Sequence, residues 1–541
     1  MRPVAVAPST NGCLPSSSPK KCTAVLPIED IIEAYENEAL GFDAETTAGA
    51  LGLARAAKSS TLLTQKERNH MAQSITAQLA EFTGACRIGK IPPEVVERAR
   101  MFVLDYLGVA LTASTARSSR IIGDVVAELG GRGTCTVIGR EYRTNALFAA
   151  LVNGTTGHAV EMDDDHRTSV LHPAVAVVPA ALAAAELKKA SGAEVIEGVV
   201  AGYEAMTRIG DAFLGTQYYE GFHPTGTCGV FGAAAAAGRI LGLSTDELIA
   251  AFGIAGTQAA GLEEWKADGS WIKRLHPGKA AESGLLAVLL AKSGYTGPAT
   301  ILEGENGFLK AFSYERKWDV RKILDGLGTE YRGYGTSFKP YAGCRFFHQV
   351  IDATLELVRE HKIDAPSVDE VIVRIYRTAY LTLFQPESRR YRPGTIVDAQ
   401  FSIPYAVAVS ILHGAPMPSH FTDELIRAPA LLALAGKVKG IADLDYESKY
   451  PARFPTEVTM RLKNGKTVQA FRDLPSGDPE NPIYARKGRF EHEMVEKFRS
   501  LLKLQPAYAA RCEEMVGKLS SLETVSDVSG LMALFTPYGR R

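Results

Sequence analysis

Three segments of the chain are dense in alanine, glycine and leucine, namely Ala174–Leu187, Gly232–Leu241 and Ala280–Lys292. Small side chains let helix axes approach closely, so such segments suit the inside of a helical bundle. Upstream, Val95, Ala99 and Phe102 recur at three- and four-residue spacing, which gives one apolar helix face. From residue 73 to residue 302 we therefore predict a compact, mostly helical domain.

The pattern changes after Gly335. The β-branched run Val371–Tyr376 suits a half-buried strand, and a second alternating run follows from Val458 to Leu462. Asn464 and Gly465 then separate this run from another alternating one, which is a strong hairpin signal. We predict a smaller α+β unit over residues 336–475.

Helical periodicity returns from Glu491 to Leu502 and from Pro506 to Phe535, so we expect the end of the chain to pack back on the first bundle. Residues 1–28 contain no acid, five prolines and four serines, a composition typical of a disordered tail. A weak organellar targeting peptide is the alternative. Residues 29–70 are acidic and then rich in alanine, which is compatible with one loose helix.

The balance of charge argues against whole classes of protein. Lys and Arg number 60 against 61 Asp and Glu, which disfavours a nucleic-acid binder or a polybasic membrane protein. No apolar run approaches the roughly 20 residues that span a bilayer, so we expect a soluble protein. The seven cysteines contain no Cys-x-x-Cys pair, which disfavours zinc knuckles and iron–sulfur clusters. Reduced cysteines suggest the cytoplasm, with the mitochondrion as the alternative.

The densest polar cluster runs from Glu161 to His166 and includes Asp163 and Asp164, with His172 eight residues after Asp164. Three readings stay open. The acids cap the helix that begins near Ala174, or His172 is a neutral base or anion-binding group at that helix start, or Asp and His bind a divalent metal.

Three further clusters carry histidine or lysine. They are Phe222–Thr227 with His223 and Thr225, Lys273–Lys279 with Arg274 and His276, and Lys339–Cys344. The plain readings are a capped loop for the first and a solvated start of the helix Ala280–Ala291 for the second. The chain shows neither a phosphate-binding glycine loop nor a G-x-S-x-G motif. Together the clusters suit cofactor-free proton chemistry on a small polycarboxylate.

Five motifs in this order resemble the MmgE/PrpD family over residues 75–535: Gly157–Asp164, Leu171–Pro173, Phe222–Pro224, Ile272–Ala281 and Lys339–Cys344. The resemblance implies a mainly α fold, with a large all-helical domain built from both chain ends (71–335 and 476–541). A smaller α+β lid domain (336–475) is inserted, and residues 1–70 are an extension. It also implies an active site between the domains without metal or organic cofactor, and a homodimer formed through the helical domain.

The resemblance also assigns roles to residues. The expected catalytic residues are His172, Lys273, Lys339 and a lid tyrosine, for which we choose Tyr380 with Tyr376 as the alternative. The expected substrate-binding residues are Glu161, Asp163, Asp164, His223, Arg274, His276 and Cys344. Two departures matter: animal cis-aconitate decarboxylases carry histidine where this chain has Cys344, and the Asn-Asp-Thr-Trp signature of 2-methylcitrate dehydratases is replaced by Met162–His166.

The function expected from these residues is that of a cofactor-free lyase acting on a citrate- or aconitate-like acid, by decarboxylation or dehydration. His172 or Lys273 would move the proton, with Tyr380 or Lys339 as the partner acid. An isomerase or epimerase would need the same proton abstraction and is the alternative within enzymes. A non-catalytic binding protein on the same fold is the alternative from another class.

Overall fold

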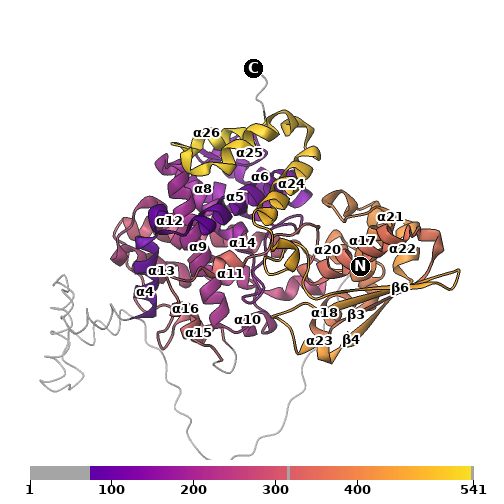
Figure 1. The fold of residues 1–541 in the computed structure, drawn as a ribbon. Helices are drawn as coiled ribbons and strands as arrows, with labels where there is room; N and C mark the ends of the chain where they lie inside the picture. The colour runs from indigo at the N-terminus through magenta and orange to yellow at the C-terminus, as the bar shows by residue number, and fades with distance from the viewer. Residues whose placement is uncertain (1–73, 314–316, 538–541) are drawn as a thin grey trace, which may run out of the picture. The chain divides into compact units, whose positions relative to one another are not determined.

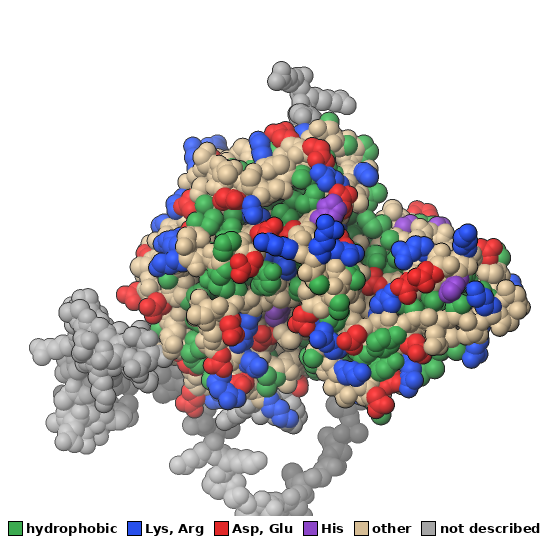
Figure 2. Space-filling model, viewed as in Figure 1, with side chains coloured by type: hydrophobic (Ala, Val, Ile, Leu, Met, Phe, Trp, Pro, Cys, Tyr) green, Lys and Arg blue, Asp and Glu red, His purple; other side chains and the backbone are tan. Residues whose placement is uncertain are grey.

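The computed structural model describes residues 74–313 and 317–537 (Figure 1). The tail and the loose helix expected within residues 1–70 lie outside the described residues, which begin at Ser74. Among the described helices, none combines the length and the apolar character needed to cross a bilayer. Basic and acidic side chains are interspersed on the face shown in Figure 2, in keeping with the net charge of −1.

The Ala-rich segments form the centre of a helical domain, as the sequence predicts. Helix α12 (Gly229–Leu241) contacts α8 (Ala174–Lys188), α9 (Gly192–Ala212) and α14 (Ile272–Lys292). Every residue of α12 is buried. A helix that is apolar on all sides has to be surrounded by other helices, and α12 is therefore the middle of the bundle.

Glycines set the distance between α14 and α7 (Ala146–Gly157). A Cβ atom on Gly278 would lie 2.2 Å from the Thr155 hydroxyl oxygen and 2.3 Å from the Leu151 carbonyl oxygen. A Cβ on Gly154 would in turn lie 2.7 Å from the Gly278 Cα. The two helices therefore touch backbone to backbone, which holds the start of α14 close to the loop that follows α7.

The end of the chain packs back on the first bundle. Helix α24 (Arg489–Lys503) lies along α5 (Pro93–Ala113), and the Lys497 ammonium is 2.7 Å from the Asp105 carboxylate (Figure 1). The helix expected over Pro506–Phe535 is broken into α25 (Cys512–Ser520), α26 (Val528–Met532) and short 3₁₀ turns. The predicted mainly α fold class is confirmed.

The remaining helices of this domain are short or peripheral. They are α4 (Ile75–Ala85), α6 (Arg117–Leu129), α10 (Thr216–Tyr219), α11 (Pro224–Thr227), α13 (Thr245–Gly256), α15 (Phe308–Ala311) and α16 (Arg321–Leu324). The strands β1 (Cys135–Thr136) and β2 (Arg143–Thr144) form a two-stranded ladder. A capping box formed by Ser244 and Glu247 begins α13.

The smaller α+β unit, for which we keep the name lid, contains a four-stranded sheet in the order β4-β3-β5-β6. Its strands are β3 (Val368–Tyr376), β4 (Val438–Asp443), β5 (Thr456–Leu462) and β6 (Thr467–Arg472). Strands β3 and β4 are parallel and the other pairs antiparallel. The predicted β5–β6 hairpin turns at Gly465, whose φ of 83° is in the left-handed region that favours glycine.

Helices cover the sheet and carry the lid's own apolar core. Helix α17 (His348–His361) contacts β5, β6 and α21 (Ile403–Leu412). The others are α18 (Arg377–Leu383), α19 (Glu387–Arg390), α20 (Ile396–Gln400), α22 (Pro429–Ala435) and α23 (Leu444–Glu447). The lid core is a separate cluster that also takes in Met162 and Trp265 of the helical domain. The limits 71–335, 336–475 and 476–541 stay a prediction.

Substituting the glycine at the helix crossing tests the close approach of α7 and α14. Gly278→Ala should lower stability by about 1–3 kcal/mol, because the added methyl group meets backbone that cannot move aside. The matched control is Gly517→Ala in α25, where a Cβ meets nothing within 4 Å. This substitution should raise the free energy of unfolding by about 0.5–1 kcal/mol, because alanine favours the helix over glycine. Thermal unfolding of both variants measures the effect, and equal midpoints would contradict the crossing.

Candidate active site

The loop between α7 and α8 carries the acidic cluster and is held from three sides. The Gly343 N–H donates to the Glu161 carbonyl at 2.9 Å, and Asp165 and Ser337 exchange two backbone hydrogen bonds of 2.9 Å. The Lys497 ammonium of α24 donates to the Met162 carbonyl at 2.6 Å. Segments from the middle and from the end of the chain therefore hold this loop in place.

Two lysines converge on one carboxylate of the loop. Lys273 donates to Glu161 Oε1, and the Lys339 ammonium lies 3.5 Å from Glu161 Oε2. All three side chains are buried, and Lys339 is 0% exposed. Burial opposes ionisation of Glu161, but the charges of Lys273 and Lys339 outweigh it and lower the pKa of this carboxyl. For Lys339, burial is outweighed by the carboxylates of Asp163 and Glu161, which raise its pKa.

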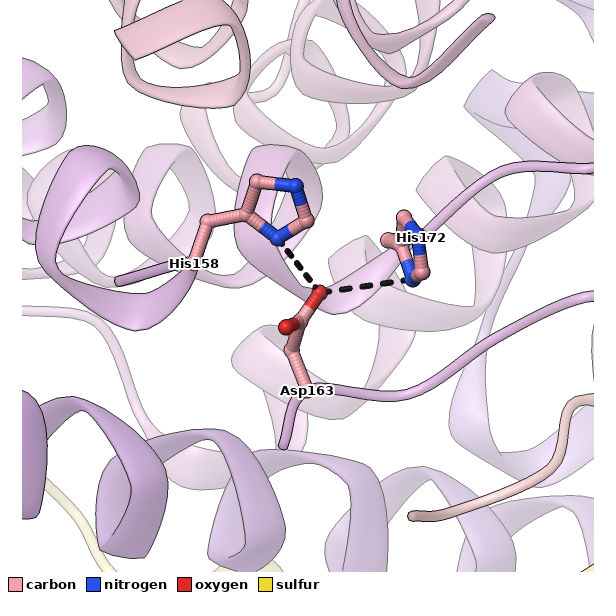
Figure 3. Close-up of side chains that lie close together, drawn as sticks. All are labelled: His158, Asp163 and His172. Atoms are coloured by element: carbon pink, nitrogen blue, oxygen red, sulfur yellow. Dashed lines mark hydrogen bonds and ion pairs between the residues drawn. The ribbon is translucent and has the colours of Figure 1, made fainter. Parts of the chain in front are cut away.

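The Asp163 carboxylate lies between two histidines and a lysine (Figure 3). Its Oδ2 atom lies 2.8 Å from His158 Nδ1 and 3.4 Å from His172 Nδ1, and its Oδ1 lies 4.0 Å from the Lys339 ammonium. Burial opposes the charge, but His158, Lys339 and His172 together lower the pKa of Asp163 well below its usual range. An ionised carboxylate only accepts hydrogen bonds, so His158 donates from Nδ1.

The protonation of His172 follows from its neighbours. Its Nδ1 lies 2.6 Å from the Asp164 carbonyl oxygen, which only accepts, so Nδ1 carries the hydrogen. Burial, with a contribution from Lys339, lowers the pKa of His172 well below its usual range. The ring is therefore neutral, with a lone pair on Nε2. The Thr225 hydroxyl accepts from the His172 backbone N–H at 3.1 Å and fixes the backbone here.

Asp164 has a different role from its neighbour. Its Oδ1 accepts from the Ala174 N–H at 3.0 Å and its Oδ2 from the Tyr203 hydroxyl at 2.6 Å. Burial raises the pKa of this carboxyl. The capping alternative drawn from the sequence therefore describes Asp164, whose two oxygens face away from the lysines into these contacts.

His223 and His276 form a second histidine pair, and the His223 ring lies 5.7 Å from that of His158 between centroids. Their Nδ1 atoms are 3.0 Å apart, and the rings are tilted by 53°. His223 is the N-cap of α11. His276 lies on α14 three residues after Lys273, so His276 and Lys273 share one face of that helix. Burial lowers the pKa of His223 well below its usual range and that of His276 to about 4.

These groups surround a cavity of about 40 Å³ that also reaches the lid. Its lining contains Glu161, Asp165, Val170, His172, Tyr218, His223, Glu263, Trp265, Lys273, Lys339, Cys344, Arg345, Phe346 and Phe401. Burial raises the pKa of the Cys344 thiol to about 11, which keeps it neutral. A larger cavity of about 700 Å³ lies in the lid around Asp352 and Arg472, away from the clustered lysines and histidines.

The expected lid tyrosine is not at the cavity. Tyr380 stacks on Phe384 at 5.5 Å between ring centroids, and its hydroxyl accepts from Gln385 at 3.3 Å. Tyr376 ends β3 with its ring inside the lid core, stacked on Tyr450 at 5.0 Å. The tyrosine of the lining is Tyr218 of α10, whose hydroxyl accepts from Lys266 at 2.9 Å.

Other expectations need smaller corrections. Helix α14 begins at Ile272 and continues through Pro277, so Lys273 lies in its first turn rather than in a loop before residue 280. Arg274 is buried behind the cavity, where it donates to Ser118 at 3.0 Å and to Gln400 at 3.3 Å. The sequence did not identify four residues at or near the cavity as site residues: His158, Tyr218, Glu263 and Arg345. His158 nevertheless lies within the motif Gly157–Asp164. The sequence around Tyr218 and Glu263 carries no motif signal.

His158, Asp163 and His172 are also the residues most able to bind a metal ion. One ligand atom from each lies within 4.8 Å of the others (Figure 3). However, His172 Nδ1 already donates to the Asp164 carbonyl and the Lys339 ammonium faces Asp163, so an ion would displace a hydrogen and meet a cation. The geometry favours a hydrogen-bonded array over metal ligation.

Two large parts of the chain match domains of known proteins. The MmgE/PrpD N-terminal domain matches residues 77–321 and the MmgE/PrpD C-terminal domain matches residues 341–520. A cis-aconitate decarboxylase-like protein of Aspergillus oryzae is 29% identical over 86% of this chain and 97% of its own. A cis-aconitate decarboxylase of Aspergillus terreus is 27% identical over 87% and 98%, and that of Mus musculus 26% identical over 86% and 94%.

Chelation tests the hydrogen-bonded reading of the His158–Asp163–His172 array. Prolonged EDTA treatment should leave the thermal midpoint unchanged, because His158 is already hydrogen-bonded to Asp163 and His172 to the Asp164 carbonyl. Elemental analysis of the purified chain should show zinc, manganese and iron well below one atom per chain. A midpoint that falls with EDTA and returns with one divalent ion would establish a metal site instead.

Proposed function

Because the chain belongs to the MmgE/PrpD family, we propose that it is a lyase that decarboxylates cis-aconitate or a closely similar unsaturated tricarboxylate. The observation that carries the proposal is the pair of buried ammonium groups, Lys273 and Lys339, beside the neutral ring of His172. The names of the similar proteins support decarboxylation over dehydration.

The lysines supply the recognition of carboxylates. Both ammonium groups are buried, and both lie at the Glu161 carboxylate. Charge-assisted hydrogen bonds of this kind are stronger than neutral ones, and a substrate carboxylate can make them in place of Glu161. A cavity of about 40 Å³ holds little more than a water, so binding requires Glu161 or the lid to move.

The reaction then needs little covalent chemistry from the protein. The bond between one carboxylate carbon and its neighbour breaks, and CO₂ leaves. The electron pair of that bond stays on the carbon skeleton, where the double bond and a second carboxylate spread the charge. One proton from outside the substrate completes the product. Positioned cations stabilise the spreading charge, and a histidine supplies the proton.

Asp163 supports this chemistry through His172. When the polyanion binds near His172, its charge favours the imidazolium form. The Asp163 carboxylate at 3.4 Å and the Asp164 carbonyl at 2.6 Å hold that ring in one orientation. The imidazolium can then hold a substrate carboxylate through a charge-assisted hydrogen bond from Nε2.

Product analysis tests the proposed reaction. The chain is incubated with cis-aconitate, trans-aconitate and methylcitrate, and proton NMR is combined with measurement of CO₂. We expect cis-aconitate to give CO₂ and one new acid in equal amounts. Loss or addition of water without CO₂ would identify a dehydratase, and a change of isomer alone would identify an isomerase.

A matched pair of lysine variants serves as the control for this assay. Lys273→Met removes the buried cation and should abolish turnover. Lys279→Met removes an exposed cation of the same helix, paired with Glu282, and should leave turnover unchanged.

The neighbouring acids Asp163 and Asp164 give a second test. Asp163→Asn removes the charge shared by His158, His172 and Lys339 and should lower kcat by about 10²–10⁴-fold, because the imidazolium loses its counter-charge. Asp164→Asn keeps an acceptor for the Ala174 N–H and should change kcat by less than about 10-fold. Equal losses in the two variants would contradict separate roles for the two acids.

A further inference from the structure

Two histidine rings connect the cavity with the surface of the site. His223 lies in the cavity lining and is 2% exposed, whereas His276 is only half-buried. Their Nδ1 atoms are 3.0 Å apart. Two ring nitrogens facing each other at this distance share one hydrogen, so one ring donates and the other accepts.

The proposed reaction creates a demand for such a connection. Decarboxylation of a tricarboxylate adds one proton to the carbon skeleton in every turnover, whereas dehydration and isomerisation add none. The catalytic groups are buried, with Lys273, Lys339 and His172 facing a cavity that holds little more than a water. A proton therefore has to reach the cavity through side chains while the substrate fills it.

The geometry points to His276 as a relay that passes a proton from solvent to His223, which gives it to the carbon that has lost CO₂. This inference rests on the proposed function. A proton enters His276 at Nε2, and the hydrogen on its Nδ1 crosses to His223 Nδ1. His223 releases its Nε2 hydrogen to the substrate carbon, where it forms the new C–H bond. Exchange with solvent after product release restores the starting tautomers.

The surroundings keep both rings ready for transfer. Besides each other, the charged or titratable groups that act on the pair are Lys273, His158 and His172. Four acids of the site contact other groups: Glu161 is bound to the lysines, Asp163 to His158 and Glu263 to Lys266, and Asp165 lies 3.8 Å from His172 Nδ1. With no carboxylate at its Nδ1 to hold the proton, the pair passes it on rather than storing it.

The backbone fixes the pair. The His223 N–H donates to the Gly261 carbonyl at 3.1 Å, and Gly261 has φ +135°, a conformation that side chains rarely adopt. A Cβ on Gly261 would lie 3.3 Å from the His276 ring. Gly226 likewise leaves room for the His276 Cβ, which lies 3.1 Å from where its own Cβ would be. His276 therefore acts as a positioned relay that reaches the substrate only through His223.

The test replaces His276 by a side chain that keeps the hydrogen bond but cannot pass a proton. In His276→Gln the amide N–H can still donate to His223 Nδ1. The matched control is His420→Gln, because His420 is also half-buried, accepts at Nδ1 from the Met417 N–H at 3.0 Å, and lies in the lid. Both variants are compared with the wild-type chain for kcat, KM, thermal midpoint and solvent deuterium isotope effect.

We expect His276→Gln to lower kcat by about 10-fold or more, with KM changed less than about twofold and a larger solvent isotope effect. Added imidazole should restore part of kcat, and His420→Gln should behave as the wild type. An unchanged kcat and isotope effect in His276→Gln would overturn the relay, as would a parallel loss of kcat and midpoint without imidazole rescue.

In His276→Asn, whose shorter amide leaves a gap at His223, the same rescue is expected, and its absence in both variants also overturns the relay. If the wild-type chain releases no CO₂, the proposed function fails, and the relay is overturned with it.

Discussion

The ion pairs of Glu161 with Lys273 and Lys339 are the constraint on which the site depends. Each partner comes from a different part of the chain: the loop after α7, the start of α14, and the segment that enters the lid. A buried charge left without a partner costs several kcal/mol, on the order of 3–5. The three segments therefore have to stay together. At Glu161 the backbone has φ +54°, a conformation unfavourable for a residue with a side chain, and the ion pairs hold it there.

The same burial has opposite effects on the lysines and on the histidines. Lys339 has two carboxylates within 4.0 Å and stays charged, because they outweigh the loss of water. At His172, burial and the charges of Lys339 and Lys273 outweigh the carboxylate of Asp163 and lower the pKa, and at His223 burial acts in the same direction as the charge of Lys273, so both rings are neutral. One enclosed site thus contains fixed cations, which suit the binding of anions, and neutral rings, which suit the transfer of protons. Water would weaken both effects by screening the charges.

Features with a local cause could be predicted from the sequence, and features set by tertiary contacts could not. The hairpin at Gly465, the capping box at Ser244 and the Ala-rich helices follow from nearby residues. The start of α14 was misplaced because Pro277 reads as a helix boundary, whereas packing against α7 carries the helix through it. Asp163 and Asp164 are adjacent acids, and only Tyr203 and the start of α8 separate their roles. The residue from α10, Tyr218, reaches the cavity by tertiary packing alone.

Two aromatic rings beside Lys273 bear on which carboxylate a substrate of the proposed kind would lose. Trp265 and Phe401 are in contact at 4.9 Å between ring centroids, and both lie over the Lys273 ammonium, at 5.6 and 5.2 Å. Carboxylates bound to Lys273 and Lys339 are stabilised as anions and keep their charge. In the proposed reaction, a third carboxylate that lay beyond hydrogen-bond reach of both lysines, against an aromatic ring or the neutral Cys344 thiol, would lose its water without gaining a hydrogen bond from a cation, so its charge would be the less stable one. Breaking the bond to that group removes the poorly solvated charge as neutral CO₂. In the proposed decarboxylation the lysines would thus decide the outcome by holding the carboxylates that remain, while the third carboxylate would lack a compensating cation.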